Sequence, residues 1–235
     1  MNLKDILGLE NGALNVDSLI TRKEIHGVSD DRISIITKEL RDGFNFIKDY
    51  PRSVTIFGGT KFTEGHPYYE KAQRLGDRIV KDLKYSVFTG GGPGIMEAAN
   101  RGAYNAGGPS LGLTIKLPDE QITNSYVNRH INFNHFFTRK VCLSFSAEAY
   151  VFFPGGFGTL DEFFEIITLI QTKKIEKVPI ILVGSDFWSR LDMFIKEELL
   201  SRKAINKEDT DLYLITDDED KIIDIIKNSP INYTK

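Results

Sequence analysis

The chain has 235 residues, of which 41% are hydrophobic and 27% are charged, and this composition is ordinary for a globular protein with a substantial core. Its formal net charge of −3 gives no reason to expect binding to nucleic acid or to an anionic membrane surface. The single cysteine, Cys142, excludes an internal disulfide and suggests a reducing compartment. No apolar run reaches the roughly 18 residues that a membrane span needs, and no secretory signal opens the chain, so a cytoplasmic location is expected.

Residues 1–50 are expected to form an N-terminal helical extension. Residues 1–30 have mixed charge and weak periodicity, and one short helix is expected there. Apolar residues then recur at helical spacing over 30–48, and Pro51 is expected to end that helix because proline cannot continue it.

Residues 51–235 are expected to form one domain in which strands and helices alternate. Short apolar or β-branched runs predict strands at 53–57, 85–89, 110–117, 131–133, 150–153, 178–183 and 212–216. Helical spacing of apolar residues predicts helices at 68–83, 95–106, 135–146, 159–171, 187–200 and 219–227. Such alternation implies a parallel sheet covered on both faces. The predicted architecture is therefore a Rossmann-like α/β domain with about seven mainly parallel strands and helices on both faces.

Three of the predicted strands end in glycine-rich turns, at Gly58–Gly59, Gly90–Gly94 and Gly155–Gly158. In a parallel sheet these turns emerge at one edge, where free backbone N–H groups and helix dipoles form a cradle for an anion. Neither the dinucleotide pattern Gly-x-Gly-x-x-Gly nor a P-loop is present. The turns favour a ligand with phosphate and polar groups, although tight turns without a ligand are the alternative interpretation.

Two charged residues each admit two interpretations. Thr159-x-x-Glu162 is a capping box in which the carboxylate reaches back to the N–H of Thr159. Glu162 also lies near the mouth of a glycine turn, where a carboxylate can stabilise positive charge or deprotonate a water molecule. Arg139, in the predicted helix 135–146, either binds a phosphate or sugar through its fork of donors or is a surface cation.

Three motifs resemble those of a known family. Residues 154–162 read Pro-Gly-Gly-Phe-Gly-Thr-Leu-Asp-Glu and match its Pro-Gly-Gly-x-Gly-Thr-x-x-Glu signature. Residues 90–97 read Gly-Gly-Gly-Pro-Gly-Ile-Met-Glu and resemble its other glycine motif, and Arg139-Lys140 resembles its Arg-Lys motif. The chain is therefore similar to the LOG family of cytokinin-activating nucleoside 5′-monophosphate phosphoribohydrolases, which were long mislabelled as lysine decarboxylases. The resemblance covers roughly residues 53–183.

The resemblance implies hydrolysis of the N-glycosidic bond of a nucleoside 5′-monophosphate, giving free base and ribose 5-phosphate without a metal or organic cofactor. It implies that Arg139 and Glu162 are the catalytic pair. The positions that it implies in substrate binding are Gly58, Gly91, Gly92, Gly94, Met96, Lys140, Gly155, Gly156, Phe157, Gly158, Thr159 and Thr168. The N-terminal extension and the first glycine motif resemble the longer bacterial members, which favours AMP or a similar purine nucleotide over a cytokinin precursor.

Two other functions compete with this interpretation. A non-catalytic carrier of a nucleotide or of a molybdenum cofactor of the pterin type would use the same glycine turns, but it would not need the pair of Arg139 and Glu162. A lysine decarboxylase needs pyridoxal phosphate bound to a lysine as an imine, and no lysine has a setting that suggests it. The predicted helices 135–146 and 159–171 carry more phenylalanines than one buried face needs, so a homodimer or a higher homo-oligomer is expected.

Overall fold

A computed structural model describes residues 30–116 and 123–229 of the chain. The short helix expected within residues 1–30 lies outside the described residues. The first described residue, Asp30, begins helix α3 (Asp30–Lys48). The chain forms two compact units, residues 1–37 and 38–235. The first unit contributes only the beginning of α3 to the described residues, and everything below concerns the second unit.

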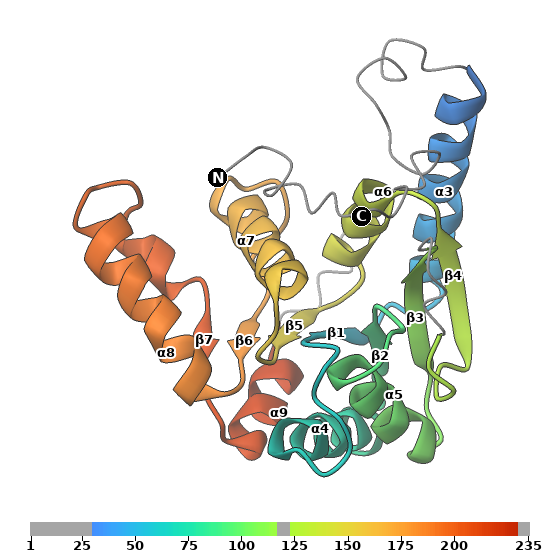
Figure 1. The fold of residues 1–235 in the computed structure, drawn as a ribbon, viewed down its shortest axis with the longest axis horizontal. Helices are drawn as coiled ribbons and strands as arrows, with labels where there is room; N and C mark the ends of the chain where they lie inside the picture. The colour runs from blue at the N-terminus through green and yellow to red at the C-terminus, as the bar shows by residue number, and fades with distance from the viewer. Residues whose placement is uncertain (1–29, 117–122, 230–235) are drawn as a thin grey trace, which may run out of the picture. The chain divides into compact units, whose positions relative to one another are not determined.

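The second unit contains a sheet of seven strands, all of them parallel to their neighbours (Figure 1). The strands are β1 (Ser53–Phe57), β2 (Ser86–Thr89), β3 (Ser110–Ile115), β4 (Arg129–Phe133), β5 (Ala149–Phe152), β6 (Ile180–Leu182) and β7 (Leu214–Ile215). Their order is β4-β3-β2-β1-β5-β6-β7, and Thr55 of β1 lies opposite both Phe88 of β2 and Tyr150 of β5. The predicted Rossmann-like α/β fold is thus confirmed. Strand order reverses between β1 and β5, and in such sheets ligands bind beyond the carboxyl ends of the strands at that reversal.

The helices of this unit agree with the predicted alternation and differ from it in detail. They are α4 (Pro67–Leu83), α5 (Ile95–Asn105), α6 (Phe136–Ser144), α7 (Phe157–Gln171), α8 (Ser185–Phe194) and α9 (Glu219–Lys227). The segment Ile195–Leu200 continues α8 with π-helical geometry. A 3₁₀ helix at Lys207–Asp211 was not expected. It is stabilised by a capping box between Asn206 and Asp209, and the spacing of apolar residues does not predict a helix of this kind.

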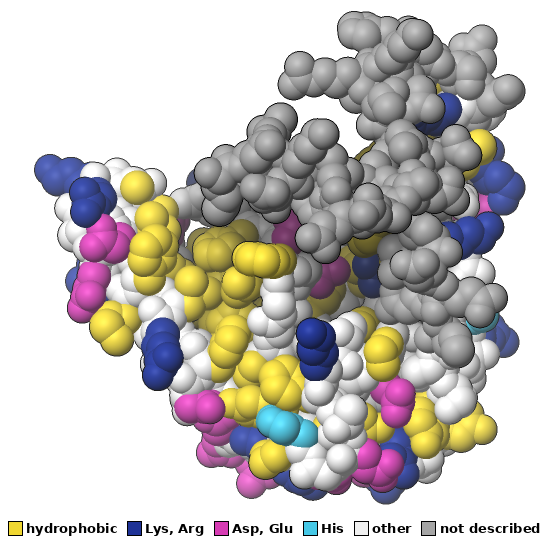
Figure 2. All heavy atoms as spheres, viewed as in Figure 1, with side chains coloured by type: hydrophobic (Ala, Val, Ile, Leu, Met, Phe, Trp, Pro, Cys, Tyr) yellow, Lys and Arg dark blue, Asp and Glu magenta, His cyan; other side chains and the backbone are white. Residues whose placement is uncertain are grey.

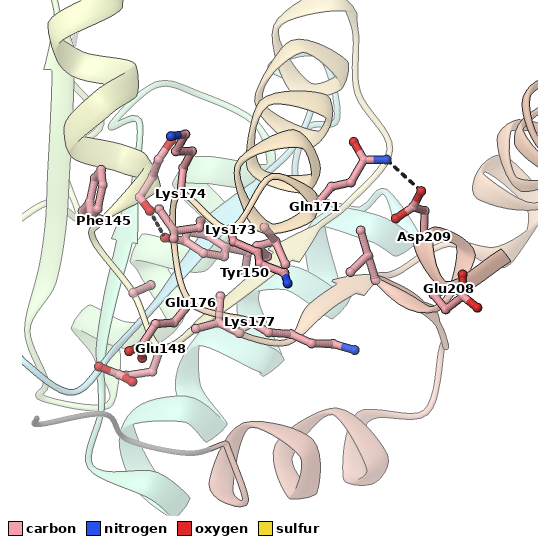
Figure 3. A pocket seen from close by; sticks show the side chains of 16 residues that line it. Phe145, Glu148, Tyr150, Gln171, Lys173, Lys174, Glu176, Lys177, Glu208 and Asp209 are labelled. Atoms are coloured by element: carbon pink, nitrogen blue, oxygen red, sulfur yellow. Dashed lines mark hydrogen bonds between the residues drawn. The ribbon is translucent and has the colours of Figure 1, made fainter. Parts of the chain in front are cut away.

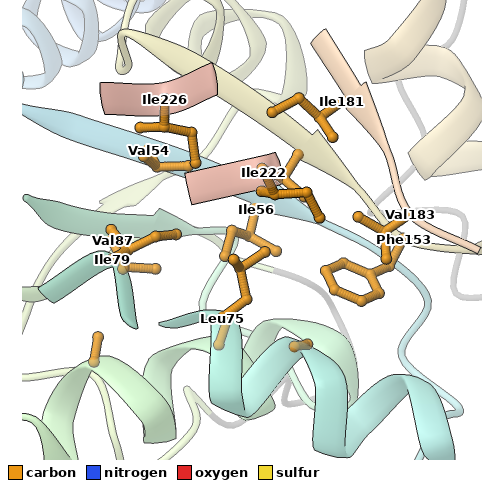
Figure 4. Packing of buried hydrophobic residues seen from close by; sticks show 14 of the residues in the cluster. Val54, Ile56, Leu75, Ile79, Val87, Phe153, Ile181, Val183, Ile222 and Ile226 are labelled. Atoms are coloured by element: carbon orange, nitrogen blue, oxygen red, sulfur yellow. The ribbon is translucent and has the colours of Figure 1, made fainter. Parts of the chain in front are cut away.

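Helices cover both faces of the sheet, so the inner strands β1, β2, β3, β5 and β6 bury side chains in two directions. On one face Val54, Ile56 and Val87 pack with α4, α5 and α9, where Leu75 and Ile222 complete the core shown in Figure 4. On the other face the alternate residues of the same strands, among them Phe57, Phe88 and Phe152, pack with α6, α7, α8 and the part of α3 after Thr37. The period of two along a strand produces this division. Within the described ranges, no helix combines the length and the apolar character needed to cross a membrane.

Helices α4 and α5 approach closely through two glycines. A Cβ atom at Gly102 would collide with the backbone carbonyl oxygen of Gln73, and one at Gly76 would collide with that of Ala99. Backbone atoms cannot move aside as a flexible side chain can, so each glycine is needed for the contact.

Replacing Gly102 by Ala is therefore expected to destabilise the protein, although alanine is the better helix former. The added methyl group must push α4 and α5 apart, which should lower the free energy of unfolding by about 1–3 kcal/mol in urea denaturation. The control is Asn105→Ala on the exposed side of the same helix, with an expected change within about 0.5 kcal/mol. A Gly102→Ala variant as stable as the parent would contradict the close packing of the two helices.

Candidate active site

A cleft of about 250 Å³ lies where the carboxyl ends of β1, β2 and β3 meet the first turns of α6 and α7. Its lining residues are Phe57, Gly58, Gly59, Thr60, Gly90, Met96, Ile115, Phe136, Arg139, Gly156, Gly158, Thr159 and Glu162. The cleft thus lies at the reversal of strand order, as expected for this class of fold. Its volume is small beside the roughly 300–1,000 Å³ that ligand pockets typically have, which favours a compact ligand.

The backbone of Gly59 ties the glycine turns to one another. Its N–H donates to the carbonyl oxygen of Pro154 at 2.9 Å, and its own carbonyl oxygen accepts from the N–H of Ile95 at 3.1 Å. Gly94 has a φ of +73° and lies so close to Gly59 and Thr60 that a Cβ atom would collide with their backbone. Glycine is required there for both reasons. The turns after β1, β2 and β5 therefore form one continuous floor of peptide groups.

Helix α7 begins with its amino end open toward the cleft. Gly156 is the N-cap residue, no side chain of the described residues caps the helix, and its first turn contains no acidic residue. The first N–H groups of a helix have no partner within the helix and favour an anion. The alternative interpretation of Thr159 and Glu162 as a capping box does not hold, because the helix begins at Phe157 and places Thr159 inside its first turn.

Arg139 reaches the cleft from α6 and is 9% exposed. Its Nε donates to the carbonyl oxygen of Leu113 at 2.6 Å, and its Nη1 lies 4.0 Å from Oε1 of Glu162. Burial lowers the pKa of Arg139, while the Glu162 carboxylate opposes that shift. A distance of 4.0 Å is too long for a hydrogen bond, so the two groups are neighbouring charges and not a closed ion pair. Their polar atoms therefore keep hydrogen-bonding capacity for a ligand.

Glu162 is a carboxyl group whose ionisation the site makes difficult. Its side chain is 16% exposed. Burial raises the pKa of Glu162 from 4.5 to about 7, because the attraction of Arg139 offsets the loss of solvent only in part, and the neighbouring carboxylate of Asp161 adds to the rise. A group that titrates near neutral pH can both accept and donate a proton, as an acid or base catalyst must.

The structure brings together most of the residues expected at the site. Gly58, Met96, Arg139, Gly156, Gly158, Thr159 and Glu162 line the cleft. Behind them, the N–H of Gly91 donates to the hydroxyl of Thr89, and the carbonyl oxygen of Gly92 accepts from the side chain of Asn124. Gly94 and Gly155 likewise shape the turns without lining the cleft.

Three residues expected to bind substrate lie elsewhere. The ammonium group of Lys140 forms salt bridges with Asp161 at 2.8 Å and Glu165 at 3.3 Å, which join α6 to α7 outside the cleft. Thr168 is exposed, and its hydroxyl donates to the carbonyl oxygen of Phe164 as is common for threonine within a helix. The side chain of Phe157 is 94% exposed and is not among the lining residues.

Six lining residues are absent from the positions expected to bind substrate, namely Phe57, Gly59, Thr60, Gly90, Ile115 and Phe136, although Gly59 and Gly90 belong to the expected glycine turns. Gly90 is the most constrained, since a Cβ atom there would collide with Nη2 of Arg139 and would lie 2.8 Å from the sulfur of Met96. Its place as the first residue after β2 could have identified it. Phe57, Thr60, Ile115 and Phe136 line the cleft by virtue of the fold, and nothing in their local sequence marks them.

A larger cavity lies away from this chemistry. It measures about 780 Å³ and lies at the opposite edge of the sheet, between the start of β5 and the end of α7 (Figure 3). Lys173, Lys174 and Lys177 line it together with Glu148 and Glu176, so charges of both signs are mixed there. None of the expected site residues takes part in it. Within residues 30–116 and 123–229, no three His, Cys, Asp or Glu side chains gather closely enough to hold a metal ion.

Replacing Glu162 by Gln is expected to stabilise the protein above neutral pH. The pKa of Glu162 is raised from 4.5 to about 7 in the folded state. The parent protein therefore loses stability as pH rises from about 4.5 to about 7, and the loss remains at higher pH. Below both pKa values the group is protonated in the folded and unfolded states and has no effect. Glutamine resembles the protonated acid, and the gain should grow from near zero at about pH 4 to about 3 kcal/mol above about pH 7. Urea denaturation at both pH values measures it, and a difference that does not change with pH would contradict the raised pKa.

Known proteins that are similar to this chain identify its family. The model of a family described as possible lysine decarboxylase matches residues 96–226. A probable cytokinin riboside 5′-monophosphate phosphoribohydrolase of Oryza sativa subsp. japonica is 28% identical over 159 residues, which are 65% of this chain and 63% of that protein. The match to this relative thus spans less than two thirds of its length.

Two further relatives carry the same enzyme name. That of Arabidopsis thaliana is 29% identical over 146 residues, 61% of this chain and 68% of the relative. That of Rhodococcoides fascians is 26% identical over 149 residues, 62% of this chain and 75% of the relative. The resemblance stated from the motifs is thereby confirmed.

Solved structures show the same fold at low identity. The molybdenum cofactor carrier protein of Chlamydomonas reinhardtii has a TM-score of 0.55 at 23% identity, covering 75% of this chain and 96% of that one. The molybdenum cofactor binding protein of Rippkaea orientalis has a TM-score of 0.52 at 24% identity, covering 75% and 95%. At such identities the likeness concerns the fold alone.

Proposed function

Because this chain belongs to the LOG family, we propose that it hydrolyses the N-glycosidic bond of a purine nucleoside 5′-monophosphate. One water molecule is consumed, and the products are the free base and ribose 5-phosphate. The observation that carries the proposal is the buried pair of Arg139 and Glu162 beside a floor of glycine backbone. The named activity of the relatives supports it at the level of the family.

The chemistry follows from the charge that develops when a ribosyl bond breaks. The sugar acquires positive charge, as in the hydrolysis of glycosides. In the proposed reaction the carboxylate of Glu162 stabilises that charge and takes a proton from the attacking water, which its pKa of about 7 allows. The guanidinium of Arg139 supports the negative charge that passes to the departing base. The base takes up one proton, which balances the proton that Glu162 removes from water.

The rest of the cleft divides into a polar and an apolar side. The open amino end of α7 offers backbone N–H groups from the first turn, which suit the phosphate. Met96, Ile115 and Phe136 supply apolar surface, which suits the flat faces of a purine. We take AMP as the first substrate to test, with cytokinin riboside monophosphates as the alternative that the relatives' names suggest.

A carrier function is the competing proposal, since two proteins of the same fold are named for binding molybdenum cofactor. Binding alone would not require a carboxylic acid held near neutral pKa beside a buried guanidinium, and this feature favours the hydrolase. A lysine decarboxylase has less support. No lysine is among the described residues lining the cleft, whereas a pyridoxal phosphate imine needs one.

The decisive experiment is incubation with AMP followed by chromatography of the products. The parent protein should release adenine and ribose 5-phosphate, and Arg139→Ala or Glu162→Gln should lower kcat/KM by about 100-fold or more. Turnover by the parent should fall as pH drops through about 7, because the carboxylate of Glu162 takes up a proton.

The matched control for that experiment is Glu165→Gln. It removes a carboxylate from the same helix, where the group pairs with Lys140 outside the cleft, so turnover should change less than about threefold. AMP binding without adenine release would favour the carrier. Unchanged turnover in both Arg139→Ala and Glu162→Gln would end the catalytic assignment.

A second prediction concerns Gly90, which lies beneath Arg139. The methyl group of a Gly90→Ala variant would collide with the guanidinium and displace it from its place beside Glu162. We expect kcat to fall by about 10- to 100-fold, since small displacements of a positioned group have effects of this size. The control is Asn105→Ala on the exposed side of α5 and outside the cleft, for which kcat should change less than about twofold. Equal losses in the two variants would argue against a special role for Gly90.

The homodimer stays a prediction. Helices α6 and α7 and the residue after α6 expose five phenylalanines, namely Phe136, Phe137, Phe145, Phe157 and Phe164. Figure 2 shows hydrophobic side chains gathered over α7 and toward α8 on the face that it draws. Exposed aromatic groups in such number are typical of surfaces that another protein covers, and a second copy of the chain is the partner we propose.

A further inference from the structure

One buried carboxylate of the described residues does not line the cleft, but it binds the start of α6, the helix that carries Arg139. Glu39 of α3 is 7% exposed. Its Oε1 accepts hydrogen bonds from the backbone N–H and the side-chain Nδ2 of Asn134, both at 2.6 Å. Its Oε2 accepts from the hydroxyl of Thr138 at 2.7 Å and lies 3.0 Å from Nδ1 of His135. All four partners lie just before α6 or in its first turn.

These contacts fill a gap in the local sequence of α6. The N-cap residue His135 makes no side-chain hydrogen bond to the helix, and the first turn contains no acidic residue. A helix amino end is stabilised by negative charge and by acceptors for its free N–H groups. Glu39 brings that charge from a different helix. Burial raises the pKa of Glu39, but the hydrogen bonds from Thr138 and Asn134 outweigh it and lower the value to about 2, so the group stays ionised at working pH.

The close approach of α3 to α6 places Glu39 where it can make these bonds. Gly43 lies one helical turn after Glu39 on the same side of α3. A Cβ atom at Gly43 would collide with the sulfur of Cys142 and would lie 3.0 Å from the ring of Phe133. Leu40 also packs into the core on this face of the sheet. The position of the carboxylate is therefore set by packing and does not depend on a flexible side chain at the surface.

The same helical turn that Glu39 holds carries the cleft residues of α6. Phe136 and Arg139 line the cleft, and Arg139 directly follows Thr138. The guanidinium reaches its place through a bond of Nε to the carbonyl oxygen of Leu113 and a contact of Nη1 with Glu162. A rotation or a shift of this turn would move the guanidinium relative to both partners.

We propose that Glu39 is a positioning residue for the hydrolase site, which fixes the first turn of α6 so that Arg139 stands beside Glu162. The inference rests on the proposed function. It adds a residue on a helix that precedes the sheet and lies outside residues 96–226, the segment that the family model matches. Glu39 touches no lining residue of the cleft except through that turn, so it acts through Arg139.

The test is a double-mutant cycle on AMP hydrolysis by the full chain, run below the melting temperature of every variant. Glu39→Gln keeps the size of the side chain but removes its negative charge and replaces one of its two acceptor oxygens with a donor group. We expect kcat to fall about tenfold or more, with KM changing less than about threefold. In the background of Arg139→Ala, the same change should cost less than about twofold, because the group through which Glu39 acts is gone.

The matched control is Asp42→Asn. It removes a carboxylate from the same helix, but one that pairs with Lys38 in solvent, so kcat should stay within about twofold. A Glu39→Gln variant with lowered melting temperature and unchanged kcat would show a structural role only and overturn the proposal. So would equal losses in the presence and absence of Arg139. If Glu39→Gln does not fold, Thr138→Val removes one donor and should lower kcat in the same direction, and an unchanged kcat in this variant would equally overturn the proposal.

Failure of the proposed function is separable from failure of this inference. If the parent protein releases no adenine, hydrogen–deuterium exchange on the ligand-free protein decides the matter. Amides of residues 134–140 should then exchange at least about tenfold faster in Glu39→Gln than in the parent and in Asp42→Asn, because the first turn of α6 opens more often. Unchanged exchange in that segment would overturn the proposal whatever the protein's activity.

Discussion

A guanidinium and a carboxyl group, both largely removed from water and 4.0 Å apart, are the interaction on which the rest of the site depends. Burying a charge is costly unless partners replace the lost water. Arg139 has one strong hydrogen bond, to the carbonyl oxygen of Leu113. Glu162 has the nearby positive charge, and its pKa still rises to about 7. The fold therefore holds two groups in a state that neither would adopt in solvent, which is the usual cost of a reactive site.

The structure around this pair explains how the fold keeps the two charged groups buried. All seven strands are parallel, and the inner strands β1, β2, β3, β5 and β6 are buried on both faces, so the edge beyond β1, β2 and β5 belongs to the core of the sheet. The backbone of Gly59 joins the turns that leave this edge. Gly90 leaves room for the guanidinium, since any larger residue would occupy its place. Glycine backbone from the turns after β1, β2 and β5 therefore forms part of the cleft lining.

The amino ends of the two helices that face the cleft have opposite surroundings. Helix α7 begins at a glycine without a capping side chain, so its N–H groups remain available to a ligand. Helix α6 also lacks a local cap, but Glu39 from α3 supplies negative charge and four hydrogen-bonding contacts. The amino end of α7 is thus open for an anion from outside, whereas the amino end of α6 has a carboxylate of the protein itself bound beside it. The difference suits a helix that binds and a helix that must hold one side chain still.

The sequence by itself determined the alternation of strands and helices and the glycine turns. Apolar spacing reports which side of an element is buried, and β1 and α9 accordingly have the predicted bounds. Only the tertiary structure decided that Lys140 pairs with α7 outside the cleft, that Gly90 lies against Arg139, and that Glu39 binds the start of a helix almost a hundred residues later. Such contacts join different elements, and their distances depend on how helices pack across the sheet. No pattern within a single element carries that information.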